Sequence, residues 1–266
     1  MHRIKYIVTV PLDEIGLRRR EDQIPKELIH RGFEPKFVPV RLGLASPELT
    51  YSDQLLFDFA VYEEGLKAES EGYDAVCMDT VSDAGLNALR SRLRIPVVGP
   101  GIASLHLAGV LGHKFSIITM WDKWLSIYSK ILREYHLEEK CASIRFINRA
   151  PDSVMLLEGK ETETAKMIEK EALKAINIDN ADVIVLGSTT MHQAHGYLSK
   201  HLPVPVLNPG LVAYKMAEML IELNLSHSRK AFPKPESSFL VGPGRLVSIE
   251  KRDQLLHRIA DAASPK

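Results

Sequence analysis

The sequence is poor in cysteine, since only Cys77 and Cys141 occur among its 266 residues. Two thiols cannot form a disulfide framework or complete a four-ligand zinc site by themselves. Net charge is missing as well, because 34 Lys and Arg residues balance 34 Asp and Glu residues. A chain without net charge creates no overall field that attracts nucleic acid or an anionic membrane. We therefore expect neither as a partner.

Long apolar runs and a targeting segment are also absent. No run of 18 apolar residues is free of charge, so no bilayer-spanning segment is expected. The first apolar run ends at Asp13, which is too short for the core of a signal peptide. Together with the few cysteines, this favours a cytoplasmic protein. No glycine-rich phosphate loop of the G-x-G-x-x-G or G-x-x-x-x-G-K type occurs, and we expect no cofactor.

What is present is an ordinary globular composition, with 45% apolar and 26% charged residues. Short apolar runs alternate with longer amphipathic stretches, which predicts parallel sheets covered by helices. The charged run Arg18–Arg20 reads as part of a solvated helix start. The predicted strands are Ile4–Val10, Phe33–Val40, Asp74–Asp79, Ile95–Val98, Lys114–Met120, Ala142–Ile147, Asp182–Leu186 and Val204–Leu207. The predicted helices are Arg19–Arg31, Tyr51–Glu71, Asp83–Arg92, Gly101–Leu111, Trp121–Tyr135, Glu161–Ile176, His192–His201, Leu211–Leu223 and Glu250–Ala262.

An internal repeat is the most informative feature of the sequence. Asp74–Thr80 matches Asp182–Ser188: an Asp opens an apolar strand that ends in a hydroxyl residue. The next segments, Ile95–Gly101 and Val204–Gly210, match in the same way. The offsets between paired segments are 108 and 109 residues. A duplicated α/β unit predicts two similar lobes related by a pseudo-twofold axis.

The repeat also predicts where the lobes divide and where a ligand binds. We expect flavodoxin-like lobes formed by residues 1–112 plus 211–266 and by residues 113–210. Ligands of such sheets lie outside the carboxyl ends of the strands. Thr80 and Ser188 both follow a strand there. The two hydroxyl groups are therefore expected to approach one small ligand from opposite sides of a cleft.

Several stretches resemble the aspartate/glutamate/hydantoin racemase superfamily, and most of all its hydantoin racemase branch. The resemblance covers about residues 1–230, in order and at plausible spacing. The stretches that carry it are Gly43–Glu48 with Tyr51 and Asp53, Asp83–Leu86, Ile95–Gly99, Leu111–Ser116, Val183–Gly187 and Val204–Ser226. The tail beyond about residue 236 has no counterpart.

The resemblance implies a cofactor-independent enzyme in which two cysteines face each other across the cleft. One thiolate removes the proton next to a carbonyl, and the other thiol protonates the opposite face. In this chain the two cysteine positions fall on Thr80 and Ser188. Cys77 lies three residues before the first position and is expected to pack in the core, and Cys141 has no predicted role. A two-thiol racemase is thus not expected.

Nearby side chains could supply different chemistry. His192 lies four residues after Ser188 and could act as its general base, with His195 one helical turn further on. Asp79, beside Thr80, could orient a base or act as one. We therefore name Thr80, Ser188, His192 and Asp79 as candidate catalytic residues. The alternative interpretations are a helix-covering role for His192, a loop acid at Asp79, and a metal site built from Asp79 and both histidines.

The hydroxyl-rich loop after Leu186 has a second predicted role. Backbone N–H groups at a helix start, together with Ser188, Thr189 and Thr190, favour binding of an anion or a carbonyl. Thr119 ends the equivalent neighbouring strand. The other expected substrate-binding residues are Asp13, Val81 and His195, where Asp13 would favour a neutral or cationic group. Asp83 is expected to cap the helix that it begins.

Two classes of function remain open at this point. The first is an enzyme acting on a small carbonyl compound such as an amino acid, a hydantoin, a cyclic amide or a related carboxylate. Its reaction is racemisation, or, because the thiols are missing, hydrolysis, decarboxylation or another lyase reaction. The second is a non-catalytic binding protein that kept the cleft. In both cases the partner is a small molecule, and a homo-oligomer is expected.

Overall fold

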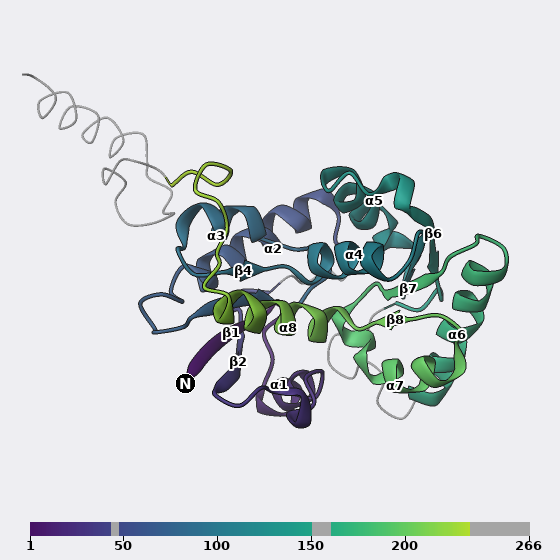
Figure 1. Ribbon diagram of the computed structural model, residues 1–266, viewed down its shortest axis with the longest axis horizontal. Coiled ribbons are helices and arrows are strands. Elements are labelled where there is room, and N and C mark those ends of the chain that lie inside the picture. Colours follow the sequence, from purple (N-terminus) through teal and green to yellow (C-terminus); the bar gives the residue numbers. More distant parts are fainter. Residues whose placement is uncertain (44–47, 151–160, 235–266) are drawn as a thin grey trace, which may run out of the picture.

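The computed structural model describes residues 1–43, 48–150 and 161–234. Two four-stranded parallel sheets lie next to each other and are covered by helices (Figure 1). The first sheet has the order β2 (Phe33–Pro39), β1 (His2–Val8), β3 (Ala75–Met78) and β4 (Val97–Val98). The second has the order β6 (Cys141–Phe146), β5 (Phe115–Thr119), β7 (Val183–Leu186) and β8 (Val206–Leu207). The predicted α/β fold with two parallel-sheet lobes is confirmed.

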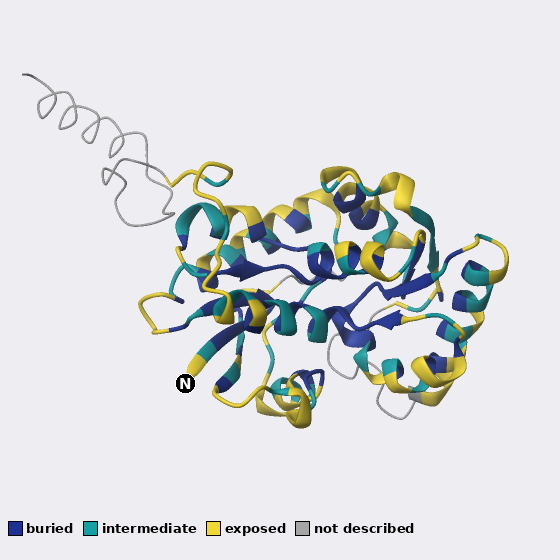
Figure 2. Cartoon of the chain, in the orientation of Figure 1, coloured by how far each residue is buried: buried dark blue, intermediate teal, exposed yellow. Residues whose placement is uncertain are grey.

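The helices lie outside the buried strands, whose residues form the dark centre of each lobe in Figure 2. The α-helices are α1 (Glu14–Glu21), α2 (Tyr51–Gly65), α3 (Leu86–Arg92), α4 (Pro100–Leu111), α5 (Leu125–Glu134), α6 (Glu161–Asn177), α7 (His192–His201) and α8 (Pro209–Glu222). Short 3₁₀ turns span Lys26–Leu28, Asp122–Trp124, Glu138–Lys140 and Thr189–Met191. No helix among the described residues combines the length and the apolar character needed to cross a bilayer. The predicted helix Glu250–Ala262 lies outside the described residues.

The internal repeat is visible in the structure as two sheets with the same strand order. β3 and β7 occupy equivalent places, and so do β4 and β8. The repeated aspartates also make equivalent hydrogen bonds to the backbone at the start of the central strands. Asp74 Oδ2 accepts the N–H of Arg3 at 2.8 Å, and Asp182 Oδ1 accepts that of Lys114 at 2.9 Å. The lobe boundaries inferred from the repeat stay a prediction.

The two helices that follow the short edge strands lie side by side between the lobes (Figure 1). α8 follows β8 of the second sheet, yet Tyr214 and Ala217 pack into the core of the first. α4 follows β4 of the first sheet, yet Leu105 and Ala108 pack into the core of the second. Each lobe therefore receives part of its core from the helix that leaves the other lobe.

The first predicted helix, Arg19–Arg31, differs from the observed structure. α1 already begins at Glu14 and ends at Glu21, and a separate 3₁₀ turn follows Pro25. Proline cannot donate the helical hydrogen bond and disfavours helical backbone in the residue before it, so the helix does not continue. The interpretation of Arg18–Arg20 as solvated is wrong for Arg20, which is 5% exposed.

Asp83 does not cap its own helix, contrary to expectation. Its backbone has a φ of 54°, and α3 begins only at Leu86, after Gly85. The carboxylate instead accepts the N–H groups of Gly101 and Ile102 at the start of α4, both at 2.7 Å. Asp83 thus stabilises the start of a helix that lies 17 residues further along the chain.

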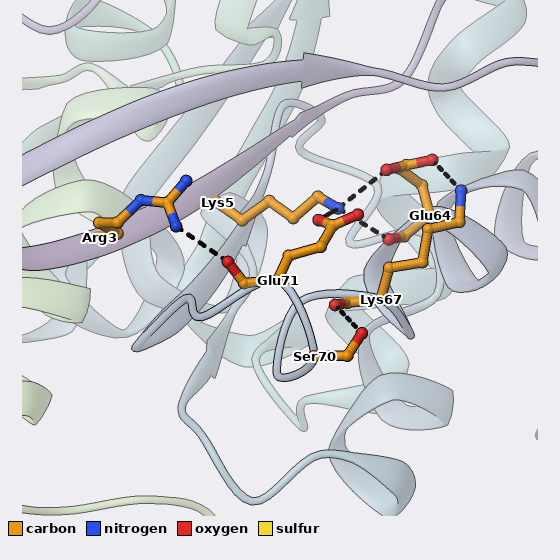
Figure 3. A network of polar contacts seen from close by, with 6 residues as sticks. All are labelled: Arg3, Lys5, Glu64, Lys67, Ser70 and Glu71. Carbon is orange, nitrogen blue, oxygen red and sulfur yellow. Dashed lines mark hydrogen bonds and ion pairs between the residues drawn. The ribbon is translucent and has the colours of Figure 1, made fainter.

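A buried charge network anchors β1 to α2 and the turn that follows it (Figure 3). The ammonium of Lys5 is inaccessible and contacts Glu64 Oε1 at 2.8 Å and Glu71 Oε2 at 2.7 Å. Lys67 donates to the other oxygen of Glu64. Burial raises the pKa of Glu64, but its bonds to Lys5 and Lys67 outweigh burial and hold that pKa below its usual value. Lys5 therefore has a structural role in holding α2.

Candidate active site

The carboxyl ends of β3 and β7 are in direct contact. The hydroxyl of Thr189 donates a hydrogen bond to the carbonyl oxygen of Asp79 at 3.2 Å, and Thr9 donates to the same oxygen at 3.5 Å. Thr80 follows Asp79, and Ser188 precedes Thr189. Thr80 and Ser188 are therefore each the direct neighbour of a residue that makes this contact. Neighbouring Cα atoms are about 3.8 Å apart. The two hydroxyl residues that the sequence singles out are brought to one place.

Thr80 and Ser188 have the same hydrogen-bond pattern, which repeats between the lobes. Thr80 Oγ1 lies 2.9 Å from Ser82 Oγ and accepts the Ser82 N–H at 3.3 Å. Ser188 Oγ lies 2.8 Å from Thr190 Oγ1 and accepts the Thr190 N–H at 3.3 Å. We call Thr80–Ser82 and Ser188–Thr190 the matched hydroxyl pairs.

The matched hydroxyl pairs are suited to donating hydrogen bonds. Ser188 is an N-cap residue with an extended backbone, and its oxygen receives the Thr190 N–H. The contact between the two hydroxyl oxygens of this pair needs only one of their two hydrogens, so the pair keeps one further hydrogen to donate. Thr80 receives the Ser82 N–H in the same manner. An unassisted aliphatic hydroxyl is too weak an acid to serve as a base or nucleophile near pH 7. A carbonyl oxygen, or the negative charge that develops on it, is the ligand that such donors recognise.

The predicted bond between Ser188 and His192 is not formed among the described residues. His192 Nδ1 instead lies 2.9 Å from the carbonyl oxygen of Thr189. A carbonyl can only accept, so Nδ1 carries the hydrogen and Nε2 keeps its lone pair. Burial lowers the pKa of His192, and the positive charge of Arg20 lowers it further. A neutral imidazole with a free lone pair at Nε2 results near pH 7.

The carboxylate of Asp79 lies in a buried polar cluster beneath α1. Arg20 Nε lies 3.0 Å from Asp79 Oδ2, and Gln23 Nε2 donates to Oδ1 at 3.1 Å. The Asp79 carboxyl group is thereby fixed between Arg20 and Gln23. Arg20 Nη1, Gln23 Oε1 and His192 Nε2 are buried without a hydrogen-bond partner in the described part of the chain. The role of Asp79 as a base stays a prediction, and this geometry favours a positioning role.

Arg20 and Gln23 are site residues that sequence reasoning missed. Arg20 lies three residues after Leu17 and four before Ile24, both of which pack in the core of the first sheet. In a continuous helix such spacing would place all three side chains on one face; in the structure α1 ends at Glu21, and Ile24 follows it in a turn. This periodicity is a usable signal for Arg20, although its residue type suggests exposure.

The remaining predicted ligand-binding residues stay predictions, and the structure shows which contacts they make. Asp13 is exposed and caps α1 by accepting the Gly16 N–H at 2.8 Å. Thr119 Oγ1 lies 2.7 Å from the hydroxyl of Tyr128. His195 Nε2 lies 3.1 Å from the carbonyl oxygen of Val206. Val81 is 3% exposed and packs in the core.

The cysteines and the histidines do not form an alternative centre. Cys77 is fully buried and lies 3.6 Å from the carbonyl oxygen of Ala213, and burial raises the pKa of its thiol strongly. Cys141 is half-buried at the edge strand β6, and burial raises its pKa to about 11. Among residues 1–43, 48–150 and 161–234, no three His, Cys, Asp or Glu side chains are grouped so that they could hold a metal ion.

Comparison with known proteins gives a consistent result. Residues 24–217 match the family model described as Asp/Glu/Hydantoin racemase. Hydantoin racemase of Pseudomonas sp. (strain NS671) is 32% identical over 206 residues, which cover 77% of this chain and 81% of that protein. Hydantoin racemase of Paenarthrobacter aurescens is 30% identical, over 69% of this chain and 77% of its own. The allantoin racemase structure from Klebsiella pneumoniae superposes with a TM-score of 0.81 and 27% identity, over 91% of this chain and 97% of that one.

Proposed function

Because this chain belongs to the Asp/Glu/hydantoin racemase family, we propose that it is an enzyme acting on a small carbonyl compound at the carboxyl ends of β3 and β7. Hydantoins and related ureides are the first substrate class to consider, since the similar proteins carry the names hydantoin racemase and allantoin racemase. The observation that carries the proposal is that each lobe contributes one of the two matched hydroxyl pairs. A protein that had lost its activity would not need hydrogen-bond donors of the same geometry on both sides of the ligand.

In the proposed reaction, Thr80 and Ser188 donate hydrogen bonds to carbonyl oxygens of the substrate. Removing a proton next to a carbonyl moves negative charge onto that oxygen. Preorganised donors stabilise this charge, and one such donor is typically worth about 10²–10³-fold in rate. The hydroxyl groups replace the thiols in position and not in acid–base role.

His192 is the proposed base. Its lowered pKa keeps the imidazole neutral near pH 7, and Nε2 has the lone pair needed to accept a proton. Nε2 is buried without a partner in the described part of the chain, so the proposal requires that the bound substrate reach this atom. Asp79 is fully buried and paired with Arg20, so it offers no matching acid on the opposite face. A site with one base takes a proton from one face of the substrate and returns it to the same face. Exchange without inversion follows from such an arrangement. A carbanion left by loss of carbon dioxide would take its proton from solvent, or from His192 after Nε2 has taken one from solvent.

Proton NMR in heavy water, read together with polarimetry, tests this proposal. The substrates are enantiopure 5-substituted hydantoins, allantoin, amino acids and substituted malonates. We expect deuterium to replace the proton next to the carbonyl faster than optical rotation is lost, or to enter the product of a decarboxylated malonate. The native protein is compared with Ser188→Ala and with Ser199→Ala, a control on the exposed part of α7.

The other outcomes identify competing functions. Loss of rotation at the rate of deuterium uptake would indicate a two-base racemase. Ring opening without deuterium uptake would indicate hydrolysis. Saturable binding without exchange or bond cleavage would favour the binding protein and overturn the enzyme.

A further inference from the structure

Residues 79–83, which follow β3 and include one of the matched hydroxyl pairs, contact the second lobe at every other position. The carbonyl oxygen of Asp79 accepts the hydrogen bond from the end of β7 at 3.2 Å. Val81 is 3% exposed and packs in the core of the second sheet. The Asp83 carboxylate accepts the hydroxyl of Tyr135, the residue that follows α5, at 2.7 Å. The segment is thus held against the second lobe at its start, its middle and its end.

The two residues between these contacts carry the hydroxyl groups of the site. Thr80 Oγ1 and Ser82 Oγ lie 2.9 Å apart, so both side chains leave the segment on the same side. The Ser82 N–H is also bound by Thr80 Oγ1, which ties the backbone of the segment to the hydroxyl pair. The three contacts to the second lobe therefore fix the backbone from which both hydroxyl groups project.

Asp83 is the charged end of this segment and joins three elements. Besides the phenol of α5, its carboxylate accepts the N–H groups of Gly101 and Ile102 at the start of α4. A Cβ at Gly101 would lie 2.3 Å from the carbonyl oxygen of Val81, so α4 lies directly against the segment. The equivalent position of the repeat, 108 residues later, is the buried Met191. A carboxylate therefore anchors the first segment, whereas its counterpart ends in an apolar side chain.

We propose that Tyr135 is a positioning residue, which acts through Asp83 to hold the Thr80–Ser82 pair in place relative to Ser188. This inference rests on the proposed function, in which donors from both lobes bind one substrate. Tyr135 is suited to the role because α5 is itself fixed, with Ile131 buried in the core of the second sheet. A donor stabilises the charge on a carbonyl oxygen only within hydrogen-bond distance, and a displacement of about 1 Å can cost about 100-fold in rate.

Hydrogen exchange of the backbone amides in the full chain tests the anchor without requiring turnover. Tyr135→Phe removes only the hydroxyl. Asn87→Ala is the matched control, since it deletes a neighbouring bond of 2.7 Å from α3 to the last residue of α5. The measurement is made at pH 8, where Asp83, with a pKa raised by burial to about 6, is ionised. We expect exchange over residues 79–83 to rise about 10-fold or more in Tyr135→Phe, because a hydrogen bond to a charged group is lost. Exchange over the other matched hydroxyl pair should not change, and Asn87→Ala should change neither.

Steady-state kinetics on the substrate identified by NMR test the effect on the reaction. Tyr135→Phe should lower kcat about 10-fold and leave KM nearly unchanged, because the transition state carries more charge on the carbonyl oxygen than the bound substrate does. In a Thr80→Ala background the same substitution should cost nothing further, since the donor that it positions is gone. Tyr197→Phe is the control for loss of a tyrosine hydroxyl, which in this case is bonded to Glu169.

The outcomes separate this inference from the proposed function. Unchanged exchange over residues 79–83 in Tyr135→Phe would overturn the anchor. An active enzyme whose kcat that variant leaves unchanged, or an equal loss with and without Thr80, would overturn the positioning role. If the native protein turns over none of the substrates, the proposed function fails, and hydrogen exchange still decides whether Tyr135 holds the segment.

Discussion

The hydroxyl of Thr189, at the end of β7, donates a hydrogen bond to the carbonyl oxygen of Asp79, at the end of β3. This contact joins the lobes at the residues adjacent to Ser188 and Thr80. The separation of the two candidate residues is therefore set by a contact in which neither the Thr80 nor the Ser188 side chain takes part. Substitutions at Thr80 and Ser188 should consequently change chemistry without changing the spacing of the strand ends.

Removing a single hydroxyl at the strand ends should lower turnover without abolishing it. Ser188→Ala or Thr80→Ala each deletes one donor, with an expected loss of about 10²–10³-fold in kcat. Initial rates on the substrate identified by NMR measure the effect, with Ser199→Ala as the unaffected control. Complete loss in Ser188→Ala, matched by complete loss in His192→Ala, would instead identify Ser188 as a nucleophile, because members of such a unit fail together.

Restoring thiols at both strand ends should change the stereochemical course. Thr80→Cys combined with Ser188→Cys places an acid–base pair on opposite faces of the ligand. We expect this double variant to lose the native reaction and to racemise a hydantoin or amino acid slowly, measured by polarimetry. Each single cysteine variant is the control. Bound ligand should also protect both introduced thiols from alkylation. If ligand gave no protection and the native activity were unchanged, residues 80 and 188 would lie outside the active site.

Removing the Arg20 side chain should destabilise the fold. Arg20→Met leaves the fully buried Asp79 carboxylate without its ion-pair partner, which typically costs about 3–5 kcal/mol in the free energy of unfolding. Urea denaturation measures this loss. Arg18→Met, on the exposed face of α1, should be nearly neutral. The double variant Arg20→Met with Asp79→Asn should recover most of the loss, and its failure to do so would contradict the ion-pair explanation.

Asp83 should make stability depend on pH in an unusual direction. Burial raises its pKa to about 6, against the opposing bonds from Tyr135, Ile102 and Gly101. Because this value lies above the ordinary pKa near 3.8, the folded state binds the proton more tightly than the unfolded state. The Asp83 contribution to stability is therefore greatest below pH 4 and is lost as the pH rises through 6.

Urea unfolding of the native protein and of Asp83→Asn at pH 4.5, 6 and 7.5 isolates this contribution. The asparagine changes stability by an amount that does not depend on pH, so the slope of the difference reports Asp83 alone. His192, which has a lowered pKa and favours the opposite trend, is common to both proteins and cancels. A difference that is flat over this range would show that Asp83 is ionised throughout.

The strands and the repeat could be predicted from the sequence because buried parallel strands are short apolar runs. Asp74 and Asp182 made the duplication recognisable, and both prove to bind the start of a central strand. The family resemblance and the α/β fold could be predicted for the same reason, because both depend on short sequence segments.

The arrangement of the site was less accessible because it depends on backbone direction at single residues. The spacing of four between Ser188 and His192 indicates neighbours only when both lie within one helix. Ser188 instead caps a 3₁₀ turn with a φ of −145°, so its hydroxyl turns toward Thr190. Arg20 was missed because its charge suggested exposure, although its spacing from Leu17 and Ile24 was that of a core position.

The placement of α4 and α8 has a consequence for how the chain folds. Neither half contains a complete core, because Tyr214 belongs to the core of the first sheet and Leu105 to that of the second. A nascent first half would expose apolar surface until residues more than 100 positions later had been synthesised. Contacts of such high sequence separation slow folding, and they also make the two lobes unfold as one cooperative unit. Fragments cut between the lobes should therefore fold only when both are present.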